Sequence, residues 1–531
     1  MKNAKVFTPD GNGAVQASVG VAGGWITAVG ELKEVRAVTG RIVPEIDLKG
    51  AMVLPGFWES HIHLVDGALF LAQIDLRGCE TPSAIAARLR EPVHALKDGE
   101  WVIGHGWANL SFPAGVAPDR HLLDELVPSN PAVLTSRDGH SAWLNTTALR
   151  LLKVVSWRLP PQEMPRDDSG EPVGMLYEAG VNRVNAKLRG FLPAEYLVKA
   201  LERLGRELSA AGITSVNDIS TGDPAHALLL RKLQRKGMFP LRIYAGPYGP
   251  SAASRRGFRL LKRLQTPDFR VGPTKYLLDG AFGSSNALLS EPYEDSPGNK
   301  GYANHSWEEL TAVIRRSLAR KEQLAVHAIG DGAIKMLLDA YDAEAGADEF
   351  IPFRNRVEHL QIVRDEDIGR LARHGLIASM QPAFLYERDL TLARVGRRRL
   401  GSTYRFRSFA AAGAPLILNS DWPYGGGVYP PRPDGGPYFG FEPLLGIHAA
   451  SSSMNANSGE IISVSRAIEG YTATPAFANW REKDLGSLEP GKRADIVALS
   501  HNILACPVDE ILKTRVLLTM VDGRIVHKTI G

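Results

Sequence analysis

The chain has 531 residues, which is more than one hydrophobic core normally organises, so we expect a large domain with a smaller companion. Hydrophobic residues make up 44% and charged residues 23% of the chain, and these proportions exclude a disordered or fibrous protein. The formal net charge of +4 comes from 62 basic and 58 acidic residues, so the composition provides no electrostatic basis for binding nucleic acid.

The two ends of the chain share a pattern of short β-type runs and turns. Residues 1–53 alternate runs such as AKVFTPDGNGAV and VAGGWITAVG with Asp-Gly and Gly-Gly turn signals. Residues 484–531, which include GSLEPGKRADIVAL and VLLTMVDGRIVHK, repeat this character. We therefore expect both termini to build one small β domain, a β-sandwich of short antiparallel strands.

The first residues, MKNAKVFTPDGNG, lack the apolar core that a secretory signal requires. No uninterrupted apolar run is long enough to span a bilayer, and no amphipathic anchor stands out. The only cysteines, Cys79 and Cys506, belong to no CxxC or Cys/His pattern, so neither a disulfide framework nor a zinc finger is predicted. We expect a cytoplasmic protein that binds neither membranes nor nucleic acid.

Eight short apolar or β-branched runs, each followed by a helical stretch, occupy the middle of the chain. Eight βα units in one series are typical of an α/β protein with a (β/α)₈ TIM barrel, which we predict for residues 54–80 and 191–483. The runs are LPGFWESHIHL, GITSVND, PLRIYAGP, TKYLLDG, LAVHAIGD, RVEHLQI, LIASMQP and PLILNSD.

The spacing of these runs has one large gap. About 150 residues separate the first run from the second, whereas the later spacings are about 20 to 50 residues. Residues 81–190, which contain Trp-rich and Pro-rich segments, are therefore predicted to form an inserted subdomain. Because βα loops emerge at the C-terminal face of a barrel, we expect this insertion to be a lid over the barrel mouth.

Five residues at the ends of these runs predict a metal site. His61 and His63 stand two residues apart, so strand alternation places both imidazoles on one face, although such a pair alone also fits hydrogen-bonded barrel lining. His327, His359 and Asp421 end the fifth, sixth and eighth runs and therefore share the C-terminal face with the first pair. Four imidazoles and a carboxylate suit Zn²⁺, Fe²⁺, Mn²⁺ or Co²⁺.

Lys275, on the fourth run, has two interpretations. An ammonium ion would repel a metal cation, so an unmodified lysine must be neutral or remote from the site. A carbamylated lysine, N6-carboxylysine, instead becomes a carboxylate that could bridge two metals, one held by His61 and His63 and the other by His327 and His359. The alternative is an ordinary lysine at the end of a strand.

Several segments resemble one known family almost from end to end. The chain resembles the amidohydrolase superfamily and, more narrowly, its YtcJ-like branch, amidohydrolase family 3, which includes N-substituted formamide deformylases. The matching segments are PGFWESHIHL, SRDGHSAWLN, TKYLLDGAFGSS, LSEPYEDSPGNKG, AVHAIGDGA, RVEHLQIV, IASMQP, NSDWP, EPLLGI, GSLEPGKRADIVAL and VDGRIV.

The resemblance implies roles for the candidate metal ligands. His61 and His63 match the first metal pair, His327 and His359 the second pair, and Lys275 the bridging position. Asp421 matches the carboxylate that contacts a metal and serves as general base for the hydrolytic water. One or two divalent ions, of which Zn²⁺ is favoured, are therefore expected.

The predicted lid contributes the candidate substrate residues. The resemblance implies that SRDGHSAWLN lines the pocket, with His140 polarising the substrate carbonyl and Arg137 and Asp138 beside it; alternatively this segment only anchors the lid. Trp107 stands where relatives commonly read GWDE, but this chain has Ala108 and Asn109 after it. Asp279 is a further substrate-binding candidate, and with Asp331 it is expected to orient ligands.

The predicted reaction is hydrolysis of an amide or formamide-type C–N bond in a small organic molecule by metal-activated water. The same site would serve an esterase, a lactonase or a cyclic amidase, and the sequence does not separate these activities. A non-catalytic metal-binding scaffold is the alternative from another class, although a scaffold has no need of the base Asp421. A homodimer is expected because symmetric pairs are the commonest assemblies.

Overall fold

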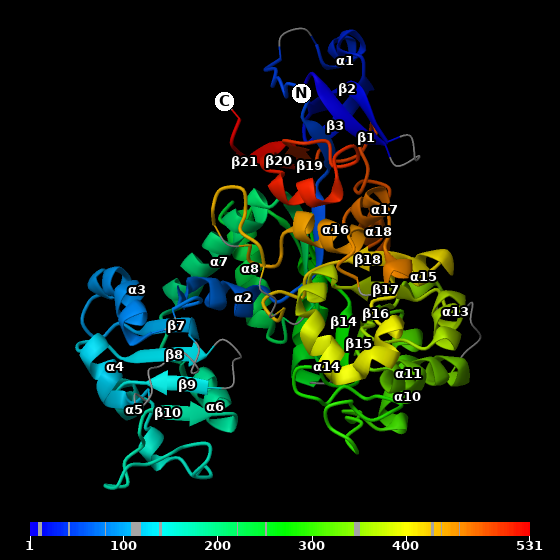
Figure 1. The fold of residues 1–531 in the computed structure, drawn as a ribbon. Helices are drawn as coiled ribbons and strands as arrows, with labels where there is room; N and C mark the ends of the chain where they lie inside the picture. The colour runs from blue at the N-terminus through cyan, green and yellow to red at the C-terminus, as the bar shows by residue number, and fades with distance from the viewer. Residues whose placement is uncertain are drawn as a thin grey trace. The chain divides into compact units, whose positions relative to one another are not determined.

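A computed structural model describes residues 1–530 apart from 9–12, 41–42, 80, 108–117, 137–140, 189, 220, 250–251, 345–350, 426–428, 437 and 456. The protein is an α/β protein with two compact units (Figure 1). The first unit combines Met1–Leu64 with Glu202–Gly531, and the second is Val65–Leu201. Among the described helices, none is both long and apolar enough to cross a membrane.

Strands from both ends of the chain form one seven-stranded sheet in the first unit, with the order β21-β20-β19-β4-β1-β2-β3. Only β1 and β4 pair in parallel, and the other neighbours are antiparallel. Buried side chains such as Val6, Val53 and Ile496 form its core, while the predicted sandwich stays a prediction. The strands are β1 (Ala4–Thr8), β2 (Gly13–Ala22), β3 (Trp25–Gly30), β4 (Met52–Pro55), β19 (Ile496–Leu499), β20 (Val516–Val521) and β21 (Arg524–Lys528).

Nine parallel strands form two further sheets in this unit, β13-β12-β11-β5 and β14-β15-β16-β17-β18. Two isolated parallel bridges connect these sheets: Tyr248, which follows β12, pairs with Lys275 of β14, and Ile62 of β5 pairs with Trp422, which follows β18. Each predicted run contains one strand, and β13 is additional. The strands are β5 (Phe57–Ile62), β11 (Ile213–Asp218), β12 (Arg242–Ala245), β13 (Phe269–Val271), β14 (Thr274–Leu277), β15 (Leu324–Ala328), β16 (Arg356–His359), β17 (Ile377–Met380) and β18 (Leu416–Leu418).

Helices between these strands cover them, and Figure 1 shows α10, α11, α13 and α15 around β14 to β18. Local sequence sets their starts: α10 begins at a capping box formed by Ser306 and Glu309, and the Asp223 carboxylate caps α8 before Pro224. The helices of the first unit are α1 (Leu32–Thr39), which contacts β2 and β3 of the terminal sheet, α7 (Ala194–Ala210), which begins in the second unit, α8 (Pro224–Arg235), α9 (Ala252–Leu261), α10 (Trp307–Arg320), α11 (Asp331–Glu344), α13 (Asp365–Arg373), α14 (Arg388–Arg399), α15 (Phe406–Ala411), α16 (Pro443–Ser451), α17 (Val464–Gly470) and α18 (Ala473–Ala478).

The second unit has its own five-stranded sheet, with the order β10-β9-β8-β7-β6. Its core includes Trp107, Leu134 and Trp143, which are fully buried. Its strands are β6 (Ile74–Asp75), β7 (Val102–Trp107), β8 (Ala132–Ser136), β9 (Ser141–Leu144) and β10 (Met175–Tyr177), and its helices are α2 (Leu64–Ala72), which begins at the boundary, α3 (Pro82–His94), α4 (Arg120–Leu126), α5 (Thr146–Leu151) and α6 (Ala179–Leu188).

Two helical glycines give opposite predictions for stability. A Cβ atom at Gly446, in buried α16, would lie 1.9 Å from the Tyr471 hydroxyl oxygen, whereas a Cβ atom at exposed Gly369, in α13, would meet no atom within 4 Å. We expect Gly446→Ala to lower the free energy of unfolding by about 1–3 kcal/mol because of overpacking. Gly369→Ala should raise it by up to about 1 kcal/mol. Urea unfolding of both variants checks this, and a stabilised Gly446→Ala would contradict the packing.

Candidate metal centre

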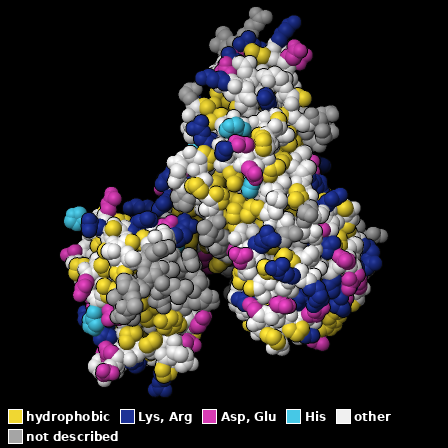
Figure 2. Space-filling view, in the orientation of Figure 1, with side chains coloured by type: hydrophobic (Ala, Val, Ile, Leu, Met, Phe, Trp, Pro, Cys, Tyr) yellow, Lys and Arg dark blue, Asp and Glu magenta, His cyan; other side chains and the backbone are white. Residues whose placement is uncertain are grey.

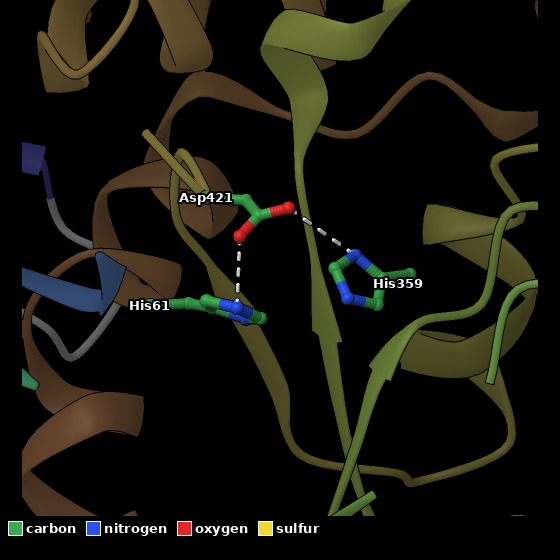
Figure 3. Close-up of side chains that lie close together, drawn as sticks. All are labelled: His61, His359 and Asp421. Carbon is green, nitrogen blue, oxygen red and sulfur yellow. Dashed lines mark ion pairs between the residues drawn. The ribbon is translucent and has the colours of Figure 1, made fainter. Parts of the chain in front are cut away.

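Three buried side chains converge at the carboxyl ends of three parallel strands. His61 lies in β5, His359 ends β16, and Asp421 follows β18. Figure 3 shows the Asp421 carboxylate between the two imidazoles, with His61 Nε2 2.9 Å from Oδ1 and His359 Nδ1 3.8 Å from Oδ2. One candidate ligand atom from each residue lies within 4.8 Å of the other two. Two nitrogens and one oxygen at this spacing could hold a divalent cation.

Two more predicted ligands contact this trio. His63, just after β5, places Nε2 2.8 Å from Asp421 Oδ1, the same oxygen that His61 contacts. Lys275, in β14, is buried with its Nζ 3.1 Å from His61 Nε2. Burial lowers the pKa of Lys275 to about 8, although Glu358 and Asp421 favour its charged form. A substantial fraction of this lysine is therefore a neutral amine near pH 8.

His327, the fifth predicted histidine or carboxylate ligand, lies beside the trio but points elsewhere. Its ring centroid is 4.3 Å from that of His359, while its Nε2 donates to the Gly280 carbonyl oxygen at 3.0 Å. Burial, followed by repulsion from Lys275, lowers the pKa of His327 to about 3, so its imidazole is neutral. The structure therefore brings His61, His63, Lys275, His359 and Asp421 into contact and leaves His327 at their edge.

The electrostatics of the trio match a cation site. Burial alone raises the pKa of the Asp421 carboxyl, but the surrounding imidazoles outweigh burial and hold that pKa well below its usual range. Burial also keeps the pKa of His359 well below its usual range. His359 Nδ1 lies 3.0 Å from Gln381 Oε1, and its buried Nε2 has no hydrogen-bond partner among the described residues. An ionised carboxylate beside a neutral, unpartnered imidazole nitrogen is the form that binds metal.

Glu358 orients His61 and was not predicted from the sequence. Its Oε2 accepts a hydrogen bond from His61 Nδ1 at 2.7 Å, which directs His61 Nε2 toward Asp421. Arg356 Nε and Ser379 Oγ donate to the same carboxylate at 2.8 and 2.6 Å, so Glu358 is fixed in place. A glutamate within an apolar β run was the available signal, because a buried carboxylate requires partners.

Glu59 supports the same centre from β5. It accepts the backbone N–H groups of His61 at 3.0 Å and Ser420 at 3.1 Å, and thereby connects β5 to the segment that carries Asp421. These hydrogen bonds lower the pKa of Glu59, but burial has the larger effect and raises the pKa to about 8. Asp421 itself adopts a left-handed backbone conformation with φ of 58°, and its N–H donates to the His61 carbonyl oxygen at 2.8 Å.

The other predicted residues have separate surroundings. Asp279 accepts backbone N–H groups from Leu288, Ile329 and Gly330 at 2.9–3.0 Å, and its Oδ1 lies 3.5 Å from His327 Nε2. Burial raises the pKa of Asp279 to about 7 despite these hydrogen bonds. Trp107 is fully buried within the second unit and donates to the Leu134 carbonyl oxygen.

The remaining predictions concern residues outside the parallel strands. The Asp331 carboxylate accepts hydrogen bonds from the backbone and the side chain of Ser290, which fixes the loop after β14. Arg137, Asp138 and His140 lie outside the described residues, so their predicted roles stay predictions.

Comparison with known proteins identifies the family of this chain. The amidohydrolase family model matches residues 44–527. Protein LONG AFTER FAR-RED 3 of Arabidopsis thaliana is 30% identical over 98% of this chain and 90% of its own length, and the N-substituted formamide deformylase of Arthrobacter pascens is 28% identical over 100% of this chain and 98% of its own. The crystal structure of an uncharacterized metal-dependent hydrolase from Pyrococcus furiosus is similar with a TM-score of 0.77 and 26% identity, covering 95% of this chain and 99% of that one. Because the amidohydrolase family model matches most of its length, this chain belongs to the amidohydrolase family.

Proposed function

We propose that this protein is a metal-dependent hydrolase that cleaves an amide or formamide-type C–N bond in a small organic molecule. The observation that carries the proposal is the buried trio of His61, His359 and Asp421, whose candidate ligand atoms lie within 4.8 Å of one another. The relative named N-substituted formamide deformylase supports the choice of bond.

The proposed scaffold is a closed (β/α)₈ barrel. Its support is the order of the two parallel sheets together with two bridges between them, from Tyr248 after β12 to Lys275 of β14 and from Ile62 of β5 to Trp422 after β18. In such a barrel the carboxyl ends of all strands share one face, where residues from distant parts of the sequence meet.

The proposed ligand set is chosen by the chemistry of the donors. His61, His63, His327, His359 and Asp421 would hold one or two divalent ions, with Zn²⁺ favoured by imidazole and carboxylate donors. Lys275 joins the set as N6-carboxylysine, in which neutral Nζ forms a bond to the carbon of CO₂ and loses a proton. The pKa of about 8 at Lys275 supports this step, because only the neutral amine reacts.

Asp421 is the proposed general base. A divalent cation, when bound, polarises the substrate carbonyl and brings a water molecule toward ionisation near neutral pH. The water oxygen forms a bond to the carbonyl carbon while Asp421 takes the proton that the water loses. The C–N bond then breaks as Asp421 passes this proton to the leaving nitrogen. Glu358 keeps His61 in one orientation throughout.

Metal analysis and a substrate panel test this function. The purified protein should contain a divalent metal by elemental analysis, and it should hydrolyse members of a panel of formamides, N-acyl amino acids and aryl amides. Chelation should abolish turnover, and Zn²⁺, Mn²⁺ or Co²⁺ should restore it. A protein that binds no metal would contradict the proposal, and a preference for matched esters would indicate an esterase instead.

Glu358→Gln is expected to weaken metal binding by about 10- to 100-fold, because the group that orients His61 becomes a weaker acceptor. Competition with a chelating dye measures this affinity without any assay of turnover. Glu442→Gln is the matched control, since Glu442 is also buried but accepts the backbone N–H groups of Phe439 and Gly440 and lies 3.9 Å from Arg432 Nη1. Equal metal affinity in the two variants would contradict the role of Glu358.

A further inference from the structure

A pocket of about 160 Å³ opens on the first unit and contains none of the candidate metal ligands. Its walls come from α9 and the residues after it, from the end of α10, and from Thr274 and Gln323 beside the first residues of β14 and β15. Gln323 precedes β15, whereas His327 lies near the end of that strand, so the pocket and the metal centre face different ends of β15.

The lining of this pocket is strongly cationic. Five lysine and arginine side chains line the pocket together with a single carboxylate, that of Glu322. The formal net charge of this lining therefore equals the +4 of the whole chain. These side chains, called the basic pocket residues below, are Arg255, Arg259, Lys262, Arg320 and Lys321.

The described carboxylates balance only part of the positive charge in the pocket. Lys262 lies 3.6 Å from Glu322, but no described carboxylate lies within ion-pair distance of Arg259, Arg320 or Lys321. Burial first, and then repulsion from neighbouring arginines, lowers the pKa of Arg255. On the same helix as Arg320, by contrast, Arg315 pairs with Glu344 at 2.8 Å.

The geometry suits a small, multiply charged anion. Guanidinium groups form paired hydrogen bonds with phosphate oxygens, and several of them around one pocket favour a ligand with more than one negative charge. Trp480, which is 46% exposed, also lines the pocket and offers it an aromatic side chain. The volume of the pocket fits a small molecule, because a nucleic-acid strand would need an extended basic groove.

We propose that the basic pocket residues form a binding site for a phosphate or polyphosphate anion that carries at least two negative charges. The anion offsets the mutual repulsion of the guanidinium groups, so its binding stabilises the folded protein. The ligand is a free phosphate or the phosphoryl part of a larger organic phosphate. In the second case Trp480 would contact the organic part.

Calorimetric titration with pyrophosphate, inorganic phosphate and ADP tests this site. Pyrophosphate should bind the wild-type protein, and the double variant Arg259→Glu/Arg320→Glu should bind it at least tenfold more weakly. The control is Arg397→Glu, a charge reversal at an exposed arginine of α14, which should leave the affinity unchanged. ADP binding that exceeds pyrophosphate binding and falls in Trp480→Ala would identify an organic phosphate, whereas equal binding would identify a free polyphosphate.

Three results would overturn the proposal. The first is equal pyrophosphate affinity in the double variant and the control. The second is binding that survives in the double variant but disappears in His61→Ala, which would place the anion at the metal centre. The third is equal stabilisation of the fold by KCl at matched ionic strength. Arg259→Gln/Arg320→Gln, which removes both charges without reversing them, replaces the double variant if charge reversal prevents folding.

Discussion

Replacing Asp421 with asparagine is expected to lower kcat/KM for the proposed C–N hydrolysis by about 10²- to 10⁴-fold. Asparagine has nearly the same shape but cannot accept a proton from water. The change also removes the negative charge that His61 and His63 contact at 2.9 and 2.8 Å. The loss should therefore appear in kcat even when metal is supplied in excess.

Elemental analysis of the same sample separates the two effects of this substitution. If Asp421→Asn retains metal and loses turnover, the carboxylate acts as a base; if metal is lost as well, it is also a ligand. Asp509→Asn is the control. The Asp509 side chain is 94% exposed and lies 3.4 Å from His448, so this variant should have the activity of the wild type. Activity of Asp421→Asn within tenfold of the wild type would exclude Asp421 as the base.

Much of this site follows from two simple patterns in the sequence. The period-two alternation of a strand puts His61 and His63 on one face, and both imidazoles contact the same oxygen of Asp421. The shared direction of parallel strands brings Asp421 beside them across about 360 positions, because the residues after β18 bridge to β5.

Other features of the site depend on contacts that no local pattern encodes. His359 has a φ of 81°, so strand alternation does not determine where its imidazole points. Glu358 meets His61 across 297 positions of sequence, and His327 turns toward the Gly280 carbonyl oxygen, an acceptor supplied by a loop. Hydrogen bonds of this kind are decided by tertiary packing, which a single sequence does not reveal.

A buried ion cluster joins the terminal sheet to the parallel strands, and it gives the largest stability prediction. Arg242 at the start of β12 is fully buried, and it binds Asp495 through Nε at 2.7 Å and Nη2 at 2.9 Å. It also pairs with Asp268, and with Asp522 at 3.2 Å. Burial alone lowers the pKa of Arg242, but these carboxylates outweigh burial and hold the pKa above its usual range.

Arg242→Ala should lower the free energy of unfolding by about 3–5 kcal/mol. The variant leaves the buried Asp495 carboxylate without its cation, and the carboxylates of Asp268 and Asp522 then repel it. Arg206→Ala is the matched control. The Arg206 side chain is 65% exposed, and its one ion-pair partner among the described residues is Glu202, one helical turn away, so its loss should cost less than about 1 kcal/mol. Urea unfolding at neutral pH measures both variants.

A second substitution shows whether the unpaired charge causes the defect. In Arg242→Ala/Asp495→Asn the buried carboxylate is neutral, so part of the lost stability should return even though a further residue has been changed. If the double variant is instead less stable than Arg242→Ala, lost packing around the arginine outweighs the unpaired charge. A change of less than about 1 kcal/mol in Arg242→Ala would show that the Arg242 cluster contributes little to holding the terminal sheet to β12.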